Sequence, residues 1–333
     1  MIKLSQNENP FGPSPLALKA IEEHYHSIHR YPEVVHNDLK SRLAKKYNVL
    51  PENIFVSGGS VGMIDLVIRS FVGPDENIVT GEITFVAYFL FSKINGRVDK
   101  RAKLVDHTIH IDNILSLCDD NTRVLFIANP NNPTGTMITH DSLNELLQTL
   151  PQNIFVVIDE AYAEYVTDVG YPDSFELQKT YSNLIIFRTF SKIYGLAGLR
   201  IGYAIARPDI IQTFEQNKMP FSVNRLAAVA ALASLDDAEY VTECASINEK
   251  ERIFLYKELK SMGFNVTPSQ GNFIFVEFSR PDEKKKLFHF LKNESVLVRD
   301  LEPFGTKTGL RISVGRPEEN QYLINSLKKF KMS

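Results

Sequence analysis

Between residues 53 and 190, short apolar runs alternate with segments that have the periodicity of helices. Strands are predicted where the apolar runs occur, at residues 54–56, 77–80, 98–105, 123–128, 154–159 and 184–188. Helices are predicted between them, at residues 63–71, 85–94 and 141–150. Strands that are apolar along nearly their whole length indicate a sheet covered on both faces, and their alternation with helices indicates parallel pairing. The pattern therefore predicts an α/β fold with a mostly parallel central sheet covered by helices.

The two ends of the chain have different patterns. Residues 1–15 contain three prolines and predict an extended arm, because proline opposes both helix and sheet. Helices are expected at residues 15–29, 37–47, 209–217, 225–235 and 240–262. Further strands at 264–267, 273–278, 296–299 and 310–314, with helices at 282–292 and 318–330, predict a smaller α+β domain. The expected division is an arm and helix of residues 1–40 that contribute to the small domain and to a dimer contact, a large domain of residues 41–245, and a small domain of residues 246–333.

Length and charge limit the classes of function. With 333 residues the chain is long enough for a large core and a second lobe. Its net charge of -3 gives no general attraction to nucleic acid. The two cysteines are too few for a disulfide framework, and no apolar run approaches the ~20 residues of a membrane span. The polar, proline-rich N-terminus does not have the pattern of a signal peptide, so the expected location is the cytoplasm.

Four of the eight histidines cluster in the sequence, at positions 24, 26, 29 and 36. His24 and His26 do not share a helix face, and no cysteine or carboxylate has the spacing of a partner ligand. A solvated helix face is the better interpretation, and no metal site is expected.

Residues 187–203 combine a lysine with groups that bind phosphate. Lys192 becomes a nucleophile once its ammonium loses a proton, which burial or a nearby cation promotes. Thr189, Ser191 and Arg200 are suited to gripping a phosphate. An isolated Ser-Lys pair most often lies on the protein surface and has no function in binding or catalysis. An imine-forming amine beside a phosphate grip, however, suggests a phosphorylated aldehyde such as pyridoxal phosphate.

Asp159 follows a run of five apolar residues and is expected to be buried, where a carboxylate needs a cationic partner. A protonated pyridine nitrogen is such a partner, and Tyr162 and Asn132 are placed to donate hydrogen bonds to the phenolate oxygen of the same ring. The alternative is that Asp159 caps a helix starting at Glu160. Asn132 belongs to the turn NPNNPTG of residues 129–135, for which an ordinary loop is the alternative.

The glycine-rich loop of residues 58–62 follows one predicted strand and precedes a helix. Free backbone N–H groups and the helix dipole favour an anion there. The loop has neither the G-x-G-x-x-G pattern nor that of a P-loop, so by itself it does not identify the ligand. Together with Asn132, Asp159 and Lys192, it falls at the C-terminal ends of predicted strands, where ligands bind in such sheets.

The order of these motifs resembles that of the fold-type I, pyridoxal-phosphate-dependent aminotransferases. The matching stretches run from QNENPFGPSP at residues 6–15 and RYPE at 30–33, through the central motifs, to GLRISVGRPEEN at 309–320. The two end stretches are similar to those of the subfamily that acts on histidinol phosphate. The resemblance implies two half-transaminations in histidine biosynthesis, with histidinol phosphate as donor and 2-oxoglutarate as acceptor.

The resemblance also implies a role for each matching residue. Lys192 would hold the cofactor through an imine and act as general base and acid, and Asp159 would pair with the pyridine nitrogen. Tyr88 would stack on the ring face. The other cofactor contacts would come from Gly59, Ser60, Asn132, Tyr162, Thr189, Ser191 and Arg200. Tyr31 would reach the cofactor phosphate of a partner subunit, which implies a homodimer.

The anionic end of the substrate would be bound by Arg311, with Arg299 assisting and Asn9 nearby. A solvated strand edge is the alternative for the two arginines. The sequence departs from the family at Ser60-Val61, where an acidic pair is common, and at Arg316, where a small polar residue is common. Three other functions stay open: transamination of an aromatic or other amino acid, decarboxylation of a phosphorylated amino acid, and binding of a phosphate ligand without catalysis.

Overall fold

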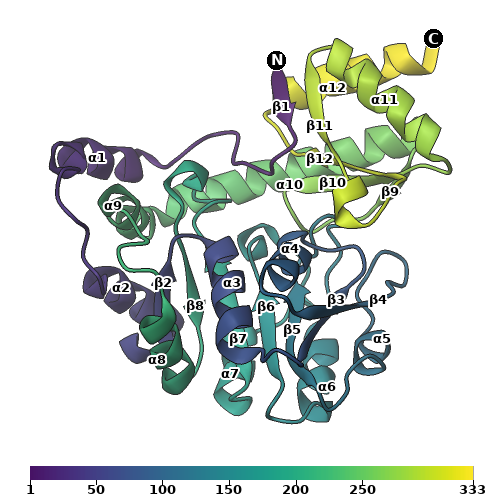
Figure 1. Ribbon diagram of the computed structural model, residues 1–333. Coiled ribbons are helices and arrows are strands. Elements are labelled where there is room, and N and C mark those ends of the chain that lie inside the picture. The colour runs from purple at the N-terminus through teal and green to yellow at the C-terminus, as the bar shows by residue number, and fades with distance from the viewer. Residues whose placement is uncertain (333) are drawn as a thin grey trace.

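A seven-stranded sheet forms the larger part of residues 1–332, which are those that the computed structural model describes (Figure 1). In spatial order its strands are β2 (Ile54–Ser57), β8 (Gly202–Ile205), β7 (Leu184–Thr189), β6 (Phe155–Asp159), β5 (Thr122–Ala128), β3 (Asn77–Gly81) and β4 (Val98–Ala102). Strand β8 is antiparallel to both of its neighbours, and the other pairs are parallel. The prediction of a mostly parallel sheet is confirmed, although the sequence pattern does not predict the four-residue strand β8.

Each face of this sheet buries its own apolar cluster. Val156 and Ile158 of β6 lie in one cluster and Val157 lies in the other, as the two-residue period of a strand requires. One face is covered by α3 (Ser60–Phe71), α4 (Ala87–Ile94) and α8 (Pro208–Asn217). The other is covered by α2 (Asn37–Tyr47), α5 (Ile111–Leu115), α6 (His140–Thr149), α7 (Ser174–Thr180) and α9 (Arg225–Ser234). Burial on both faces explains why these strands are apolar throughout.

A second, smaller sheet lies above the first in Figure 1. Its strands, in spatial order, are β1 (Ile2–Leu4), β11 (Val296–Asp300), β12 (Gly309–Ser313), β10 (Phe273–Glu277) and β9 (Asn265–Thr267). Helices α11 (Pro281–Asn293) and α12 (Pro317–Met332) pack against it around a third apolar cluster. The expectation that residues 1–15 avoid sheet structure is wrong for the first few residues. The prolines begin at Pro10, so the N–H groups of residues 2–4 are free to pair with β11.

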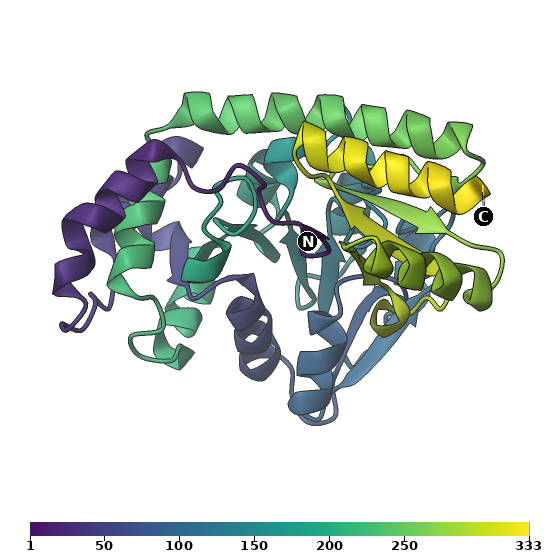
Figure 2. The ribbon, with the colours of Figure 1, turned by 90° about the horizontal axis from the view of Figure 1, so that it is seen from above.

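Helix α10 (Ala238–Ser261) runs along one side of the molecule and joins the two sheets, with α12 beside it (Figure 2). The predicted domain boundary at residue 245 falls inside this helix, and the division into domains stays a prediction. Helix α1 (Pro15–His24) packs on α9 and is shorter than expected, because a 3-10 turn, η1 (Tyr25–Ser27), follows it. The remaining 3-10 turns are η2 (Pro51–Asn53), η3 (Ala163–Tyr165), η4 (Ala197–Leu199) and η5 (Glu302–Phe304). Among residues 1–332, no helix combines the length and the apolar character needed to span a bilayer.

Candidate active site

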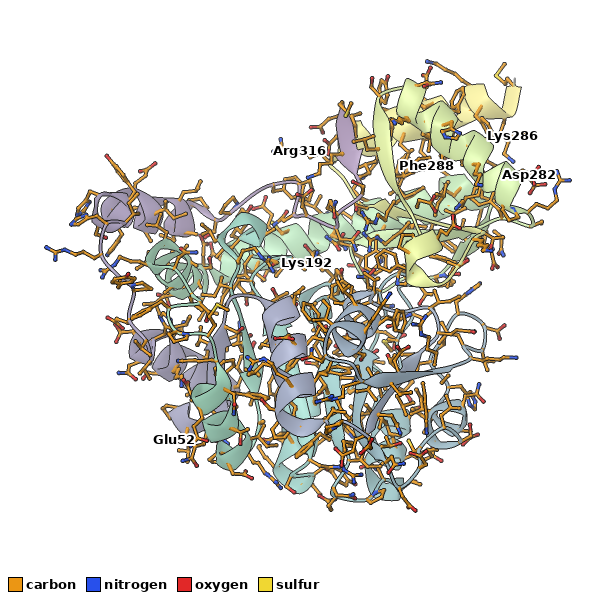
Figure 3. All side chains as sticks on the ribbon, viewed as in Figure 1. Glu52, Lys192, Asp282, Lys286, Phe288 and Arg316 are labelled. Atoms are coloured by element: carbon orange, nitrogen blue, oxygen red, sulfur yellow. The ribbon has the colours of Figure 1, made fainter. Side chains whose placement is uncertain are left out.

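A cavity of about 250 Å³ lies between the two sheets, at the C-terminal ends of β5, β6 and β7. Lys192 lies there, between the larger and the smaller lobe (Figure 3). The cavity brings together ten of the predicted site residues: Ser60, Asn132, Asp159, Tyr162, Thr189, Ser191, Lys192, Arg200, Arg299 and Arg311. Three consecutive strand ends of a parallel sheet thus meet residues that come from the smaller sheet and from the N-terminal arm.

Lys192 stands in the loop after β7, and its side chain is half-buried. Its Nζ donates a hydrogen bond to the Gln6 carbonyl at 3.2 Å and lies 5.5 Å from the centroid of the Tyr162 ring. No carboxylate forms an ion pair with this ammonium in the described part of the chain. The amine is therefore accessible from the cavity and is held by a neutral acceptor.

Asp159 ends β6 and is almost completely buried. Its Oδ2 accepts a hydrogen bond from the Tyr88 hydroxyl at 3.0 Å, whereas its Oδ1 has no hydrogen-bond partner among the described residues. Burial raises the pKa of Asp159 to about 6, although the hydrogen bond from Tyr88 opposes this effect. The alternative role of a helix cap does not hold, because the next helical turn begins only at Ala163. A buried carboxylate with one free oxygen fits a protonated pyridine nitrogen.

Tyr88 does not line the cavity, so the prediction that its ring stacks on the cofactor is wrong. The Tyr88 side chain is fully buried, with its hydroxyl on Asp159, and its ring stacks on that of Phe126 with centroids 4.8 Å apart. Phe85 and Val86 line the cavity at this place instead. The reason is the start of α4 at Ala87: Phe85 lies before the helix, and Tyr88 lies on the helix face that packs against the sheet.

One end of the cavity is built around the first turn of α3. Gly59 precedes this helix with a φ of 98°, and a Cβ on Gly59 would collide with the guanidinium of Arg200. Arg200 Nη1 donates to Ser191 Oγ at 3.2 Å. The hydroxyl of Thr189 accepts from the Ser191 backbone N–H at 3.1 Å. With Ser60 at the helix start, these hydroxyls, the guanidinium and the free N–H groups match a phosphate monoester.

Two arginines form the opposite end of the cavity. Arg299 of β11 and Arg311 of β12 are directly paired across neighbouring antiparallel strands, and both guanidinium groups lie over the Phe304 ring at 5.5 and 5.6 Å. Among the described residues, neither arginine has a carboxylate partner. Arg311 is buried, so the alternative of a solvated strand edge does not hold for it. Like charges placed opposite each other are unfavourable unless an anion lies between them.

Arg311 is held by neutral groups and keeps unused binding capacity. It donates to the Asn132 side-chain oxygen and to the Ser5 carbonyl, the latter at 2.8 Å. Its Nε is buried and has no partner in the described part of the chain. Burial lowers the pKa of Arg311 to about 10, and the charge of Arg299 contributes to this shift. The side chain is therefore still a cation near pH 7. Asn132 turns its oxygen to Arg311, which leaves its amide N–H groups for the cavity.

Asn9 and Tyr31, like Tyr88, are predicted site residues that do not line the cavity. Asn9 was expected near the substrate, but it is buried and donates to the Ile193 carbonyl at 2.7 Å, so it holds the segment next to Lys192. Tyr31 is 80% exposed, and its ring packs at a tilt against that of Phe221, with centroids 4.8 Å apart. Tyr31 therefore contacts nothing in the cavity of its own chain.

The sequence pattern does not predict several residues in or beside the cavity. Phe85, Phe304 and Gln6 line the cavity, and Asn7 donates a hydrogen bond to the Tyr162 hydroxyl at 3.1 Å. Phe85 directly follows Thr84 and is an aromatic residue just before a helix, and this position could have indicated it from the sequence. No spacing signals Asn7, because Tyr162 lies 155 residues further along the chain. Arg316, which departs from the family pattern, donates to the Pro10 carbonyl at 2.9 Å and so holds the arm rather than the cavity.

Comparison with known proteins agrees with this geometry. Residues 1–327 match the family described as aminotransferase class I and II. A histidinol-phosphate aminotransferase of an Anaeromyxobacter species is 39% identical, over 98% of this chain and 89% of the relative. One from Caldicellulosiruptor saccharolyticus is 37% identical, over 99% and 91%. The crystal structure of histidinol-phosphate aminotransferase from Sinorhizobium meliloti in complex with pyridoxal-5'-phosphate has a TM-score of 0.93 and 26% identity, over 99% of this chain and 91% of that one. The chain belongs to the aminotransferase class I and II family, whose cofactor is pyridoxal phosphate.

Proposed function

We propose that this enzyme transfers the amino group of histidinol phosphate to 2-oxoglutarate, giving imidazole acetol phosphate and glutamate in histidine biosynthesis. The observation that carries the proposal is the pairing of Arg299 with Arg311 in the cavity that contains Lys192. A phosphate monoester carries a charge of about -1.5 to -2 near neutral pH, which suits two unpaired guanidinium groups better than a single carboxylate does. The names of the relatives support the same donor.

The other end of the cavity would hold the cofactor. Pyridoxal phosphate, when bound, supplies an electron sink that stabilises negative charge on the substrate carbon next to the nitrogen. The free Oδ1 of Asp159 would bind the pyridine nitrogen and keep it protonated. Tyr162 and the amide of Asn132 would donate to the ring oxygen, and Phe85 would cover one ring face. The phosphate would be bound by the cluster of Gly59, Ser60, Thr189, Ser191 and Arg200.

Lys192 would hold the cofactor covalently and would also move protons. Once released by the incoming amine, its Nζ would take the proton from the substrate carbon that carries nitrogen and deliver it to the cofactor side. The Gln6 carbonyl accepts a hydrogen bond from this Nζ and limits where the side chain moves. Arg299 and Arg311 would fix the far end of the substrate, so that the carbon faces Lys192.

We further propose a homodimer in which Tyr31 completes the cavity of the partner. Tyr31 and Phe221 form an exposed aromatic pair, and Val34, Val35 and Met219 nearby are exposed as well. Such a surface is typical of a contact with another chain.

Mixing a Tyr31→Ala variant with a Lys192→Ala variant tests this idea. In a mixed dimer one cavity has both defects and the other has neither, so activity should return. Two inactive variants that stay inactive after mixing and subunit exchange would contradict the shared site.

The cytoplasm is the proposed location, since the pathway works on small soluble metabolites. Fractionation of producing cells, followed by detection of the protein in the soluble and membrane fractions, tests this.

The decisive experiment follows the amino-donor half-reaction. Protein loaded with pyridoxal phosphate is mixed with histidinol phosphate, histidinol or phenylalanine, and the loss of the cofactor's yellow colour is recorded by stopped flow. We expect histidinol phosphate to react fastest by at least about 100-fold, since charged hydrogen bonds contribute about 1.5–3 kcal/mol each. Lys192→Ala should bind the cofactor without this reaction. Preference for phenylalanine would refute the donor, and release of carbon dioxide from a phosphorylated amino acid would indicate a decarboxylase.

A further inference from the structure

The N-terminal arm closes one side of the cavity through three consecutive residues. The carbonyls of the first two accept hydrogen bonds from Arg311 and Lys192. Any residue type is able to make such backbone contacts. The third residue, Asn7, uses its side chain, because its Nδ2 donates to the Tyr162 hydroxyl at 3.1 Å. Asn7 is therefore the arm residue whose chemical identity matters to the cavity.

The orientation of the Asn7 amide is fixed by its other hydrogen bonds. The Asn7 backbone N–H donates to Ser313 Oγ at 2.8 Å, and Ser313 Oγ donates its proton to Asn7 Oδ1, also at 2.8 Å. If the amide were reversed, the proton of the buried Ser313 hydroxyl would have no acceptor among the described residues, so the amide end that faces Ser313 is the oxygen. The other end, which faces Tyr162, must be the NH₂ group. Asn7 is 1% exposed and has a φ of 57°, a conformation that asparagine tolerates better than most residues.

This arrangement leaves one direction for the proton of Tyr162. The hydroxyl accepts from Asn7 and has no other hydrogen-bond partner within residues 1–332. Its own proton must point away from the Asn7 N–H, and Tyr162 lines the cavity. We infer that Asn7 is a positioning residue that turns the hydroxyl proton of Tyr162 toward the ring oxygen of the bound cofactor. The inference rests on the cofactor part of the proposed function and not on the identity of the amino donor.

Asn7 also connects the two lobes at this point. Tyr162 follows β6 of the large sheet, and Ser313 ends β12 of the small sheet two residues after Arg311. A purely structural role for Asn7 would consist of this connection alone. Its loss would then lower stability without changing how the cofactor ring titrates.

The test measures the pH midpoint of the colour change in protein loaded with pyridoxal phosphate. A hydrogen bond to the ring oxygen favours its charged form, so Tyr162→Phe should raise this midpoint. Asn7→Ala should also raise the midpoint, but by less, because it weakens the Tyr162 hydrogen bond and does not remove it. We expect a shift of about half a unit to one unit, since one pH unit corresponds to about 1.4 kcal/mol. Asn7→Asp should act at least as strongly, since a carboxylate accepts the Tyr162 proton and turns it away from the ring.

A double variant shows whether Asn7 acts through Tyr162. In the Tyr162→Phe background, Asn7→Ala should cause no further shift, because the group that it orients is gone. Glu8→Gln is the matched control: it exchanges an acid for an amide on the next arm residue, whose side chain pairs with Lys3 outside the cavity. Its midpoint should equal that of the wild type. If Asn7→Ala does not fold, Asn7→Asp keeps the size of the side chain and gives the same readout.

Three results would overturn the inference: an unchanged midpoint in both Asn7 variants, equal shifts in the presence and absence of the Tyr162 hydroxyl, or a loss of thermal stability with no colour shift. A protein that shows the expected shifts but does not convert histidinol phosphate would refute the proposed donor and still support the role of Asn7.

Discussion

The Tyr88 hydroxyl donates a hydrogen bond to Oδ2 of Asp159 at 3.0 Å, and the other carboxylate oxygen has no partner among the described residues. The Tyr88 hydroxyl thus satisfies one oxygen of the buried Asp159 carboxylate. Asp159 lines the cavity, so a ligand bound there would be able to satisfy this second oxygen. The protein alone therefore carries an electrostatic cost at this position, which a cationic ligand would offset.

Because of this cost, Asp159→Asn should stabilise the cofactor-free protein at pH 8. Burial raises the pKa of Asp159 from 3.8 to about 6. Between pH 3.8 and about pH 6, Asp159 is therefore protonated in the native state, whereas the same carboxyl group has lost its proton in the unfolded chain. The stability contributed by this proton is complete below pH 3.8 and is lost as the pH rises through about 6. The variant should gain about 1–3 kcal/mol over the wild type at pH 8, since one pKa unit corresponds to about 1.4 kcal/mol.

Urea denaturation of both proteins at pH 4 and pH 8 measures this difference, which should nearly vanish at pH 4. Adding pyridoxal phosphate should stabilise the wild type more than the variant, because the variant lacks only the carboxylate that would pair with the ring nitrogen. An Asp159→Asn variant with the same pH dependence as the wild type would contradict the buried, unpaired carboxylate.

Gly59→Ala should weaken cofactor binding more than it weakens the fold. The positive φ of Gly59 is strained for alanine, and the new methyl group would displace the guanidinium of Arg200 from the phosphate-binding end. We expect a stability loss of about 1–2 kcal/mol and a clear rise in the dissociation constant for pyridoxal phosphate, measured by fluorescence titration. Gly62→Ala is the control, because Gly62 lies inside α3 and a Cβ there would meet only Ser57 Oγ, at an ordinary contact distance of 3.5 Å. It should bind the cofactor like the wild type.

Arg188→Met should be among the most destabilising changes outside the cavity. Arg188 forms ion pairs with Glu160 at 2.8 Å and Glu164 at 3.1 Å, and the Glu160 side chain is fully buried. Burial raises the pKa of Glu160, and removing its cation leaves an isolated buried carboxyl group. Breaking a buried pair from one side costs about 3–5 kcal/mol. The double variant Arg188→Met with Glu160→Gln should recover part of this loss in urea denaturation. If the double variant lost as much free energy of unfolding as the two single variants together, Arg188 and Glu160 would not be directly coupled.

Arg311 should contribute more than Arg299 to recognition of the substrate phosphate. Arg311 is buried, whereas Arg299 is half-buried and its charge is better screened by water. We expect Arg311→Gln to lower kcat/KM for histidinol phosphate by about 100-fold or more and Arg299→Gln by about tenfold, from the strength of charged hydrogen bonds. The same variants should change the slow reaction with histidinol, which has no phosphate, far less. Equal losses with both donors would place these arginines away from the phosphate.

The sequence predicts the sheet and the strand ends because both depend on local patterns. The apolar run before Asp159 and the position of Lys192 after a predicted strand are readable from a few neighbouring residues. Parallel pairing then brings such strand ends to one edge, which is how the cavity came to contain most of the predicted residues. The errors at Tyr88 and Phe85 have a local cause as well. Helix α4 begins two residues later than predicted, and this shift changes which aromatic side chain reaches the cavity.

By itself, the sequence determined the α/β class, the amine and the carboxylate of the site, since propensity and apolar periodicity act over a few residues. Only the tertiary structure decided that Arg299 faces Arg311 and that Asn7 reaches both Tyr162 and Ser313. Asn7 and Ser313 are 306 residues apart in the chain. Such contacts depend on strand register and on the packing of one sheet against the other, and no local pattern records either of them.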